Sequence, residues 1–305
     1  MKKKICLLAV AVVLAAAACN KGTTGTNPTD VPATLTPTPE ATVTPTPEPT
    51  ATPKPTATPA PETDWYEDMM KASLVSTGNN ARLKKVLEKA RNGETVNIAA
   101  LGGSVTEGAG ANSMNGGYAY QFADAFAEAY GTDRGKNINF VNAGLGGTPS
   151  SLGVIRFQRD IVEELGAEPD LFILEFAVND YGEVTGGRAY ESLVRDVLSQ
   201  DNDAAVILVF SVFKSKWNMQ SDYIPVGKYY DLPMVSIRDA VAVPYLRGNL
   251  DDTKFFSDEY HPTTYGHTIM SDCIMHLIDE IDKEEAEEMN VLSETGRKPL
   301  DFCKV

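Results

Sequence analysis

Residues 171–178 read Leu171-Phe172-Ile173-Leu174-Glu175-Phe176-Ala177-Val178, an almost uninterrupted apolar run. Such a run is typical of a strand that is covered on both faces, as in a parallel sheet between two layers of helices. Four shorter apolar runs are also predicted to be strands, at residues 96–101, 138–141, 205–212 and 233–237. The sequence therefore predicts five strands in one sheet.

Amphipathic stretches separate these runs along the chain. Apolar residues recur at helical spacing at residues 80–91, 118–130, 152–165, 190–198 and 263–281. Strands that alternate with helices indicate an α/β domain, in which a five-stranded parallel sheet lies between helix layers in a three-layer α/β/α arrangement. Active sites in such sheets gather beyond the carboxyl ends of the strands, so polar motifs at those positions are the candidates for function.

The first residues have the pattern of a secretory signal. Three lysines, at positions 2–4, precede an apolar run over residues 5–18 that is too short to span a membrane, and alanines lead to Cys19. We therefore expect residues 1–18 to be a signal peptide. A cysteine at this place resembles a bacterial lipobox, which implies lipidation of Cys19 and anchoring at the extracellular face of the cell membrane. The alternative is an ordinary signal peptide that releases a secreted protein.

Residues 22–63 hold 11 of the 18 prolines of the chain, mostly alternating with Thr, Ala or Glu. Nothing large and apolar is present there to bury, and Thr-Pro repeats favour an extended polyproline II backbone. Residues 19–63 are therefore predicted to be the lipidated N-terminus and a disordered linker. Residues 64–305 remain, a length that suits one α/β catalytic domain.

The region 64–305 is strongly acidic. It holds 22 of the 27 Lys and Arg residues and 38 of the 42 Asp and Glu residues, which gives a formal net charge of −16. A domain of this charge would repel nucleic acid, because nucleic acid is bound by clustered basic side chains. Neutral substrates such as polysaccharide esters fit better, and a membrane is expected as a partner only through the N-terminal lipid.

Two cysteines, Cys273 and Cys303, lie outside the predicted leader and lipid site. An oxidising exterior would allow them to pair, but Cys273 lies in an apolar helical pattern that also fits a buried thiol. No Cys-x-x-Cys spacing indicates a metal site. We expect neither a metal nor a cofactor.

Ser104 follows the first predicted strand in Leu101-Gly102-Gly103-Ser104-Val105-Thr106-Glu107-Gly108. The two glycines allow a sharp turn that exposes the hydroxyl at the edge of the sheet, although on its own such a segment is more often only a turn. A phosphate-binding loop would need Gly-Lys-Ser/Thr, and a nucleophile elbow would need glycine at position 106. Ser104 would become a nucleophile only if a base removed its proton.

Two further segments follow predicted strands. Residues 142–148 read Asn-Ala-Gly-Leu-Gly-Gly-Thr, and their N–H groups would be able to bind a developing oxyanion or form only a flexible turn. Pro149 replaces the third glycine of a dinucleotide fingerprint, which makes a Rossmann cofactor site a poor fit. Asn179 and Asp180 end the central apolar run: the neutral amide of Asn179 would donate to an oxyanion, whereas Asp180 is more typical of a cap.

One of the three histidines lies in a predicted loop, in Asp258-Glu259-Tyr260-His261-Pro262. An aspartate three residues before His261 would be able to hydrogen-bond one imidazole nitrogen, fix its tautomer and stabilise the imidazolium, as in a Ser-His-Asp system. The other two, His267 and His276, fall within the last predicted helix, where histidine is more often structural.

The four segments together resemble, in order, the sequence blocks of the SGNH (GDSL-type) hydrolases, over most of residues 95–275. This resemblance implies the flavodoxin-like SGNH hydrolase fold. It also implies roles: Ser104 as nucleophile, His261 as general base and Asp258 as the residue that orients it. The oxyanion hole would consist of the N–H groups of Ser104 and Gly147 and the side-chain amide of Asn179.

Two positions depart from the family pattern. Gly103 stands where the Gly-Asp-Ser motif has Asp, and Ala177 stands where the Gly-x-Asn-Asp block has Gly. Neither change removes a catalytic group. The Gly-Gly-Ser variant is most similar to bacterial extracellular carbohydrate esterases, which shifts the expectation away from lipases.

The resulting hypothesis is a secreted serine esterase that removes small acyl groups, above all O-acetyl, from an acylated polysaccharide. Three alternatives stay open: a non-catalytic surface glycan-binding module on the same scaffold, an O-acetyltransferase that uses a sugar as acceptor, and a lipase or lysophospholipase. The sequence predicts neither the polymer, nor the acylated position, nor the oligomeric state.

Overall fold

The computed structural model describes residues 64–290. The predicted signal peptide, the predicted lipidation site at Cys19 and the predicted linker up to residue 63 lie outside the described residues, as does Cys303. Within residues 64–290, no helix is long and apolar enough to cross a membrane.

A six-stranded sheet forms the centre of the structure, with the strand order β1-β6-β5-β4-β2-β3. Five of its strands run parallel and match the five predicted ones: β2 (Val96–Gly102), β3 (Ile138–Gly144), β4 (Leu171–Glu175), β5 (Ala205–Phe210) and β6 (Met234–Ser236). The α/β prediction is confirmed. The strand count differs by one, because β1 (Leu74–Ser76) adds an antiparallel edge strand next to β6.

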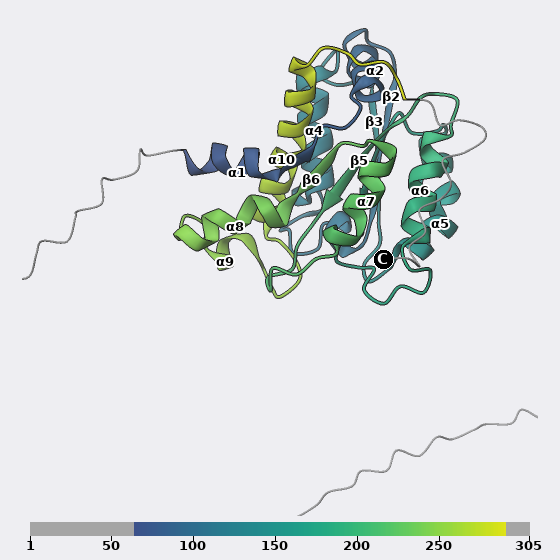
Figure 1. Cartoon of the computed structure of the whole chain (residues 1–305). Coiled ribbons are helices and arrows are strands. Elements are labelled where there is room, and N and C mark those ends of the chain that lie inside the picture. Colours follow the sequence, from purple (N-terminus) through teal and green to yellow (C-terminus); the bar gives the residue numbers. More distant parts are fainter. Residues whose placement is uncertain (1–63, 291–305) are drawn as a thin grey trace, which may run out of the picture. The chain divides into compact units, whose positions relative to one another are not determined.

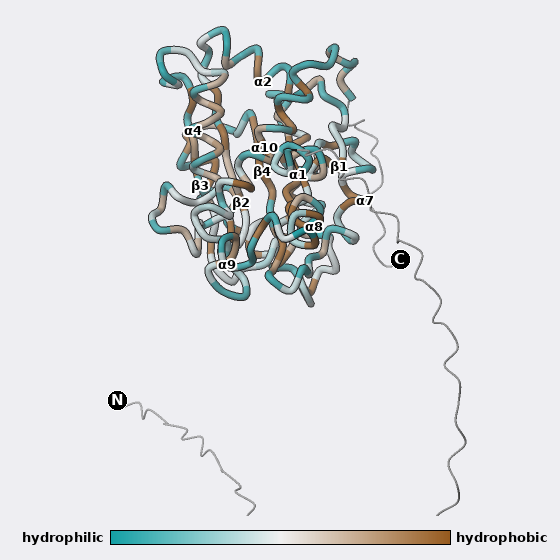
Figure 2. The backbone as a smooth tube through the Cα atoms, turned by 90° about the vertical axis from the view of Figure 1, so that its left-hand side faces the viewer, coloured by the Kyte–Doolittle hydropathy of each residue, from teal (hydrophilic) through white to brown (hydrophobic). Residues whose placement is uncertain are grey.

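The central strands are buried on both faces because their side chains alternate between two separate cores. In β2, Ile98 and Ala100 belong to one core, whereas Ala99 and Leu101 belong to the other. The register pairs Ile98 with Leu171 of β4, so neighbouring strands place their apolar side chains side by side. Figure 2 shows the hydrophobic residues gathered along the central strands.

Helices cover both faces of this sheet, as Figure 1 shows. One core is completed by α1 (Trp65–Ser73), α2 (Ala81–Arg91), α4 (Tyr118–Tyr130), α8 (Ile237–Arg247) and α10 (Thr264–Lys283). The other core is completed by α5 (Ser150–Phe157), the π-helix η2 (Gln158–Glu163), α6 (Arg188–Leu198) and α7 (Gln220–Tyr230). Three short helices lie in connections: α3 (Ser104–Glu107), η1 (Met114–Gly116) and α9 (Asp252–Phe255).

The helical pattern departs from the expectation in several ways, and α1 is one of the helices that were not predicted. The stretch 152–165, predicted as one helix, is an α-helix over Ser150–Phe157 that continues as the π-helix η2. The helices α7 and α8 were not predicted, and each contains an internal proline, Pro225 and Pro244. Proline removes a helical hydrogen bond and usually ends a helix, so these two prolines argued against a helix in either segment.

Cys273 is completely buried on α10 and forms no disulfide with any described residue. Burial raises the pKa of its thiol to about 12, so it is protonated at neutral pH. Within residues 64–290 this cysteine is a packing residue, as the apolar helical pattern around it suggested.

Candidate active site

Ser104 is the first residue of α3, directly after β2 and Gly103. The turn that carries it, residues 102–108, is called the nucleophile turn below. The carbonyl oxygen of Gly102 accepts hydrogen bonds from the N–H of Leu145 (3.1 Å) and from the guanidinium of Arg156 (3.1 Å). The backbone just before the serine is therefore fixed from the β3 side, and the hydroxyl is left partly exposed at the carboxyl end of the strand.

His261 lies in a loop of residues 256–262, called the histidine loop below, which an isolated bridge between Phe256 and Pro262 closes. Its Nε2 lies 3.0 Å from the Ser104 Oγ, and its Nδ1 lies 2.8 Å from the Asp258 Oδ2. The structure thus joins three residues that the sequence separates by up to 157 positions. These distances are within the reach required for proton transfer from the hydroxyl to the imidazole.

Asp258 also organises the loop in which it lies. Its Oδ1 accepts the backbone N–H groups of Tyr260 (2.7 Å) and His261 (2.9 Å). Partial burial by itself opposes ionisation, but the imidazole and these two N–H groups together hold the pKa of Asp258 below its usual range. The carboxylate is therefore ionised at neutral pH, with one oxygen bound to the backbone and the other to the imidazole.

The side chain of Asn179 lies directly against the nucleophile turn. A Cβ added to Gly103 would come within 2.2–2.4 Å of the side-chain amide atoms of Asn179, which is closer than real contacts allow. Glycine at position 103, where the Gly-Asp-Ser motif has aspartate, therefore leaves room for the Asn179 amide directly against residue 103. The buried Oδ1 of Asn179 has no hydrogen-bond partner among the described residues.

The glycine-rich loop after β3 passes on the other side of Ser104. A Cβ added to Gly146 would lie 3.7 Å from the Ser104 Cβ. The neighbouring Gly147 is exposed and has a φ of 70°, a left-handed conformation that favours glycine. The segments of Ser104, Gly146–Gly147 and Asn179 therefore converge at the carboxyl ends of β2, β3 and β4.

Asp180 holds the end of this loop in place. Its carboxylate accepts the backbone N–H of Ser150 (2.7 Å), the first residue of α5, and the hydroxyl of Tyr223 (2.5 Å). The carboxyl is buried, and burial raises its pKa. Asp180 thus acts as a cap from a distant part of the chain, as its position at the end of the apolar run suggested.

Glu175, at the end of β4, is the main residue of this region that the sequence analysis missed. It is completely buried, and its carboxylate accepts hydrogen bonds from Ser211 and from Thr106 of the nucleophile turn (3.1 Å). The Tyr118 hydroxyl lies 2.9 Å from the Thr106 Oγ1. Burial raises the pKa of Glu175 to about 7, although the hydroxyl donors oppose this rise. A glutamate inside an apolar run gives no sequence signal of partners 36 and 69 residues away.

The remaining histidines have other surroundings. The Nδ1 of His267 accepts the N–H of Tyr118 (3.2 Å), so its Nε2 carries the proton and donates to the carbonyl of Ala109 (3.0 Å). Burial lowers the pKa of His267 to about 4, which keeps it neutral. His276 lies on α10, 4.0 Å from Glu280. Neither hydrogen-bonds to Ser104, which fits the structural role expected from the sequence.

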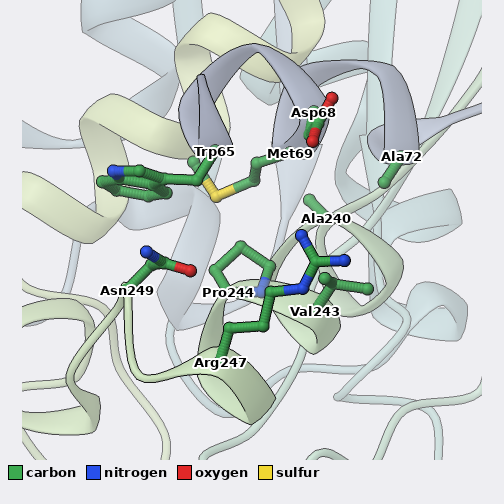
Figure 3. Close-up of a pocket in the computed structure, with 9 residues that line it drawn as sticks. All are labelled: Trp65, Asp68, Met69, Ala72, Ala240, Val243, Pro244, Arg247 and Asn249. Carbon is green, nitrogen blue, oxygen red and sulfur yellow. The ribbon is translucent and has the colours of Figure 1, made fainter. Parts of the chain in front are cut away.

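A pocket of about 220 Å³ lies between α1 and α8, lined by Trp65, Met69, Pro244, Arg247 and their neighbours (Figure 3). None of its lining residues belongs to the nucleophile turn or the histidine loop. Among residues 64–290, no three His, Cys, Asp or Glu side chains are grouped so that they could hold a metal ion.

Comparison with known proteins places the chain in a family. The model of the GDSL-like lipase/acylhydrolase family matches residues 100–269. A solved structure described as a two-domain esterase active on acetylated mannans is 32% identical, over 76% of this chain and 61% of that chain, with a TM-score of 0.68. A structure of such an esterase co-crystallised with mannopentaose is also 32% identical, over 74% and 61% of the two chains, with a TM-score of 0.64.

This chain thus spans about three fifths of the length of the two-domain esterase. No curated protein matches it.

Proposed function

Because the chain belongs to the GDSL-like lipase/acylhydrolase family, we propose that it is a serine esterase that removes acetyl groups from a polysaccharide. The observation that carries the proposal is the continuous path of hydrogen bonds from Asp258 through His261 to Ser104. Such a path supplies what a serine lacks by itself, a base that is positioned to take its proton.

In the first half of the reaction, the Ser104 oxygen forms a bond to the ester carbonyl carbon while its proton passes to the Nε2 of His261. Asp258, ionised and bound to Nδ1, stabilises the imidazolium that results. The tetrahedral intermediate then expels the sugar hydroxyl, which takes the proton from His261. An acetyl group remains on Ser104.

In the second half, His261 removes a proton from water, and the resulting hydroxide attacks the acetyl-enzyme. The intermediate releases acetate, and the proton returns from His261 to the Ser104 oxygen. In both halves the developing oxyanion would be held by the N–H groups of Ser104 and Gly147 and by the amide of Asn179. Loss of one such donor typically costs roughly 100- to 1,000-fold in turnover.

Acetylated mannan is the substrate that we propose to test first. The esterase that is 32% identical to this chain is described as active on acetylated mannans. The net charge of −16 over residues 64–305 also suits a neutral polymer better than an anionic one.

The test is acetate release by the purified protein from acetylated mannan, xylan, pectin and peptidoglycan, with Ser104→Ala as the inactive variant and Ser113→Ala, an exposed serine, as the matched control. We expect Ser104→Ala to lower turnover by about 10⁴-fold or more and Ser113→Ala to leave it unchanged. Equal rates for the parent and Ser104→Ala would refute the mechanism. Faster cleavage of long-chain 4-nitrophenyl esters than of 4-nitrophenyl acetate would refute the acetyl preference.

A further inference from the structure

Four aromatic side chains form a continuous series that begins next to His261. The ring centroid of Tyr260 lies 6.1 Å from that of His261. The centroids of Phe213 and Tyr260 are 5.1 Å apart, and those of Trp217 and Phe213 are 5.8 Å apart. Tyr181 completes the series at 5.6 Å from Trp217. We call Tyr260, Phe213, Trp217 and Tyr181 the aromatic row.

The aromatic row is unusually exposed for side chains of this size. Tyr181 is 81% exposed, Tyr260 55% and Trp217 37%, whereas Phe213 is partly buried. Among residues 64–290, the only other exposed large aromatic side chain is Tyr265, which lies beside Lys254. Single exposed apolar residues need no explanation, but a contiguous set next to a reactive centre marks a binding surface.

Backbone hydrogen bonds fix the loops that carry the aromatic row. The N–H of Lys214 donates to the carbonyl of Glu259 in the histidine loop (3.2 Å), and the N–H of Met219 donates to the carbonyl of Ala177 at the end of β4 (2.8 Å). Within the middle loop, the N–H of Phe213 donates to the carbonyl of Trp217 (3.1 Å). The row is therefore assembled before any ligand binds, which lowers the entropic cost of binding.

We propose that the aromatic row is a subsite for the polysaccharide chain, which lies along Trp217 and Tyr181 while one of its acetyl esters reaches Ser104. This inference rests on the proposed function. A pyranose ring has apolar faces of C–H groups and an equator of hydroxyl groups. Exposed Trp and Tyr rings supply apolar area for those faces and leave the hydroxyl groups in water.

The position of the aromatic row favours a polymer over a small ester as its ligand. The row starts at the residue before His261 and leads away from it through three further rings. An acetyl group with a small alcohol would contact only the first of these rings. Sugar units on either side of the acetylated one would contact the others, so the row selects long substrates.

The first experiment measures binding without catalysis. Affinity electrophoresis of Ser104→Ala in gels that contain soluble acetylated mannan is compared with the same protein carrying Trp217→Ala, Tyr181→Ala or both. Each single truncation should weaken retardation by about tenfold, and the double variant by more. Trp217→Phe should restore most of the binding because it keeps an aromatic face, and Tyr265→Ala is the matched control outside the row.

The second experiment compares two substrates on the active protein. In Trp217→Ala, kcat/KM on acetylated mannan should fall about tenfold relative to kcat/KM on 4-nitrophenyl acetate, chiefly through KM. Equal binding and an equal substrate ratio for the parent and the folded double variant would overturn the subsite. So would a dimer in sedimentation that Trp217→Ala dissociates, because the row would then be a contact between copies. Retardation by the polymer without any acetate release would instead contradict the proposed esterase function.

Discussion

Ser104 and His261 are held in place by different kinds of structure. Beneath the nucleophile turn lie completely or nearly completely buried polar side chains from distant strands and helices, above all Glu175 and Arg156. The histidine loop is partly exposed and is held mainly from within, by Asp258 and by the bridge between Phe256 and Pro262. One half of the site is supported by the core, and the other half by its own local sequence.

This difference predicts how each half should respond to substitution. A buried hydrogen-bonded carboxylate is costly to remove, because its partners then lose an acceptor inside the protein. An exposed loop tolerates changes in its charges, because water replaces the lost partners. Changes around the nucleophile turn should therefore affect stability together with activity, whereas changes in the histidine loop should affect activity almost alone.

Of the changes that test this comparison, Asp258→Asn should have the largest effect. The amide oxygen would still accept the N–H groups of Tyr260 and His261, but the side chain would no longer stabilise the imidazolium or fix its tautomer. We expect kcat to fall about 10³- to 10⁴-fold, while the free energy of unfolding changes by less than about 1 kcal/mol. Kinetics on 4-nitrophenyl acetate and urea unfolding measure the two quantities.

Glu259→Gln is the matched control for that variant, since Glu259 is an exposed neighbour that forms a single ion pair within residues 64–290, a 3.6 Å contact with Lys214. Glu259→Gln should leave both kcat and the free energy of unfolding unchanged. A loss of several kcal/mol of stability in Asp258→Asn would contradict the view that this loop acts on activity alone.

A smaller loss is expected for Gly103→Ala. The new methyl group would overlap the Asn179 amide and displace it from the backbone of Ser104. Because the oxyanion donor that we propose would be lost, turnover should fall roughly 100- to 1,000-fold. Gly103→Asp, which introduces the family's usual residue, should be at least as damaging for the same steric reason.

Asn179→Ala tests this explanation through a double-mutant cycle. If Gly103→Ala acts by displacing Asn179, the double variant should be little worse than either single variant. Strictly multiplicative losses would show that the methyl group acts on the nucleophile turn by another route.

The smallest effect is expected for Glu175→Gln, and it concerns the dependence of stability on pH. The pKa of Glu175 in the folded protein, about 7, lies above the usual glutamate value of 4.5, so the folded protein binds this proton more tightly than the unfolded chain does. The contribution of Glu175 to stability is therefore fully present below about pH 4.5 and is lost as the pH rises to about 7. Glu175→Gln should flatten this slope, as measured by urea unfolding at pH 5, 6 and 7.5. An unchanged slope would contradict the raised pKa.

Much of this architecture could be predicted because it depends on local pattern. The apolar run at 171–178, which contains β4, and the helical period at 118–130 each lie within one short window of sequence. The strand β1 could not be predicted in this way, because three residues are too few to show alternation. The helices α7 and α8 were missed because Pro225 and Pro244 oppose their helical pattern, and packing against the sheet outweighs that local preference.

In the candidate site too, the contacts between residues close in sequence could be predicted, and those between distant residues could not. Asp258 and His261 are three residues apart, so their hydrogen bond could be predicted from the sequence. Thr106 and Glu175 are 69 residues apart, and only the pairing of β2 with β4 brings them together. The aromatic row was missed for the same reason, because its four residues come from three separate loops.

The short strand β1 has a consequence for the behaviour of the protein at high concentration. A long open strand at the border of a sheet offers unpaired N–H and C=O groups to the border of another molecule, which is a common route to aggregation. Here the β6 border is covered by only three residues, in antiparallel direction and with an irregular register between Leu74 and Ser76. Such an ending offers little template for a second chain, so crowded molecules should stay separate along this border.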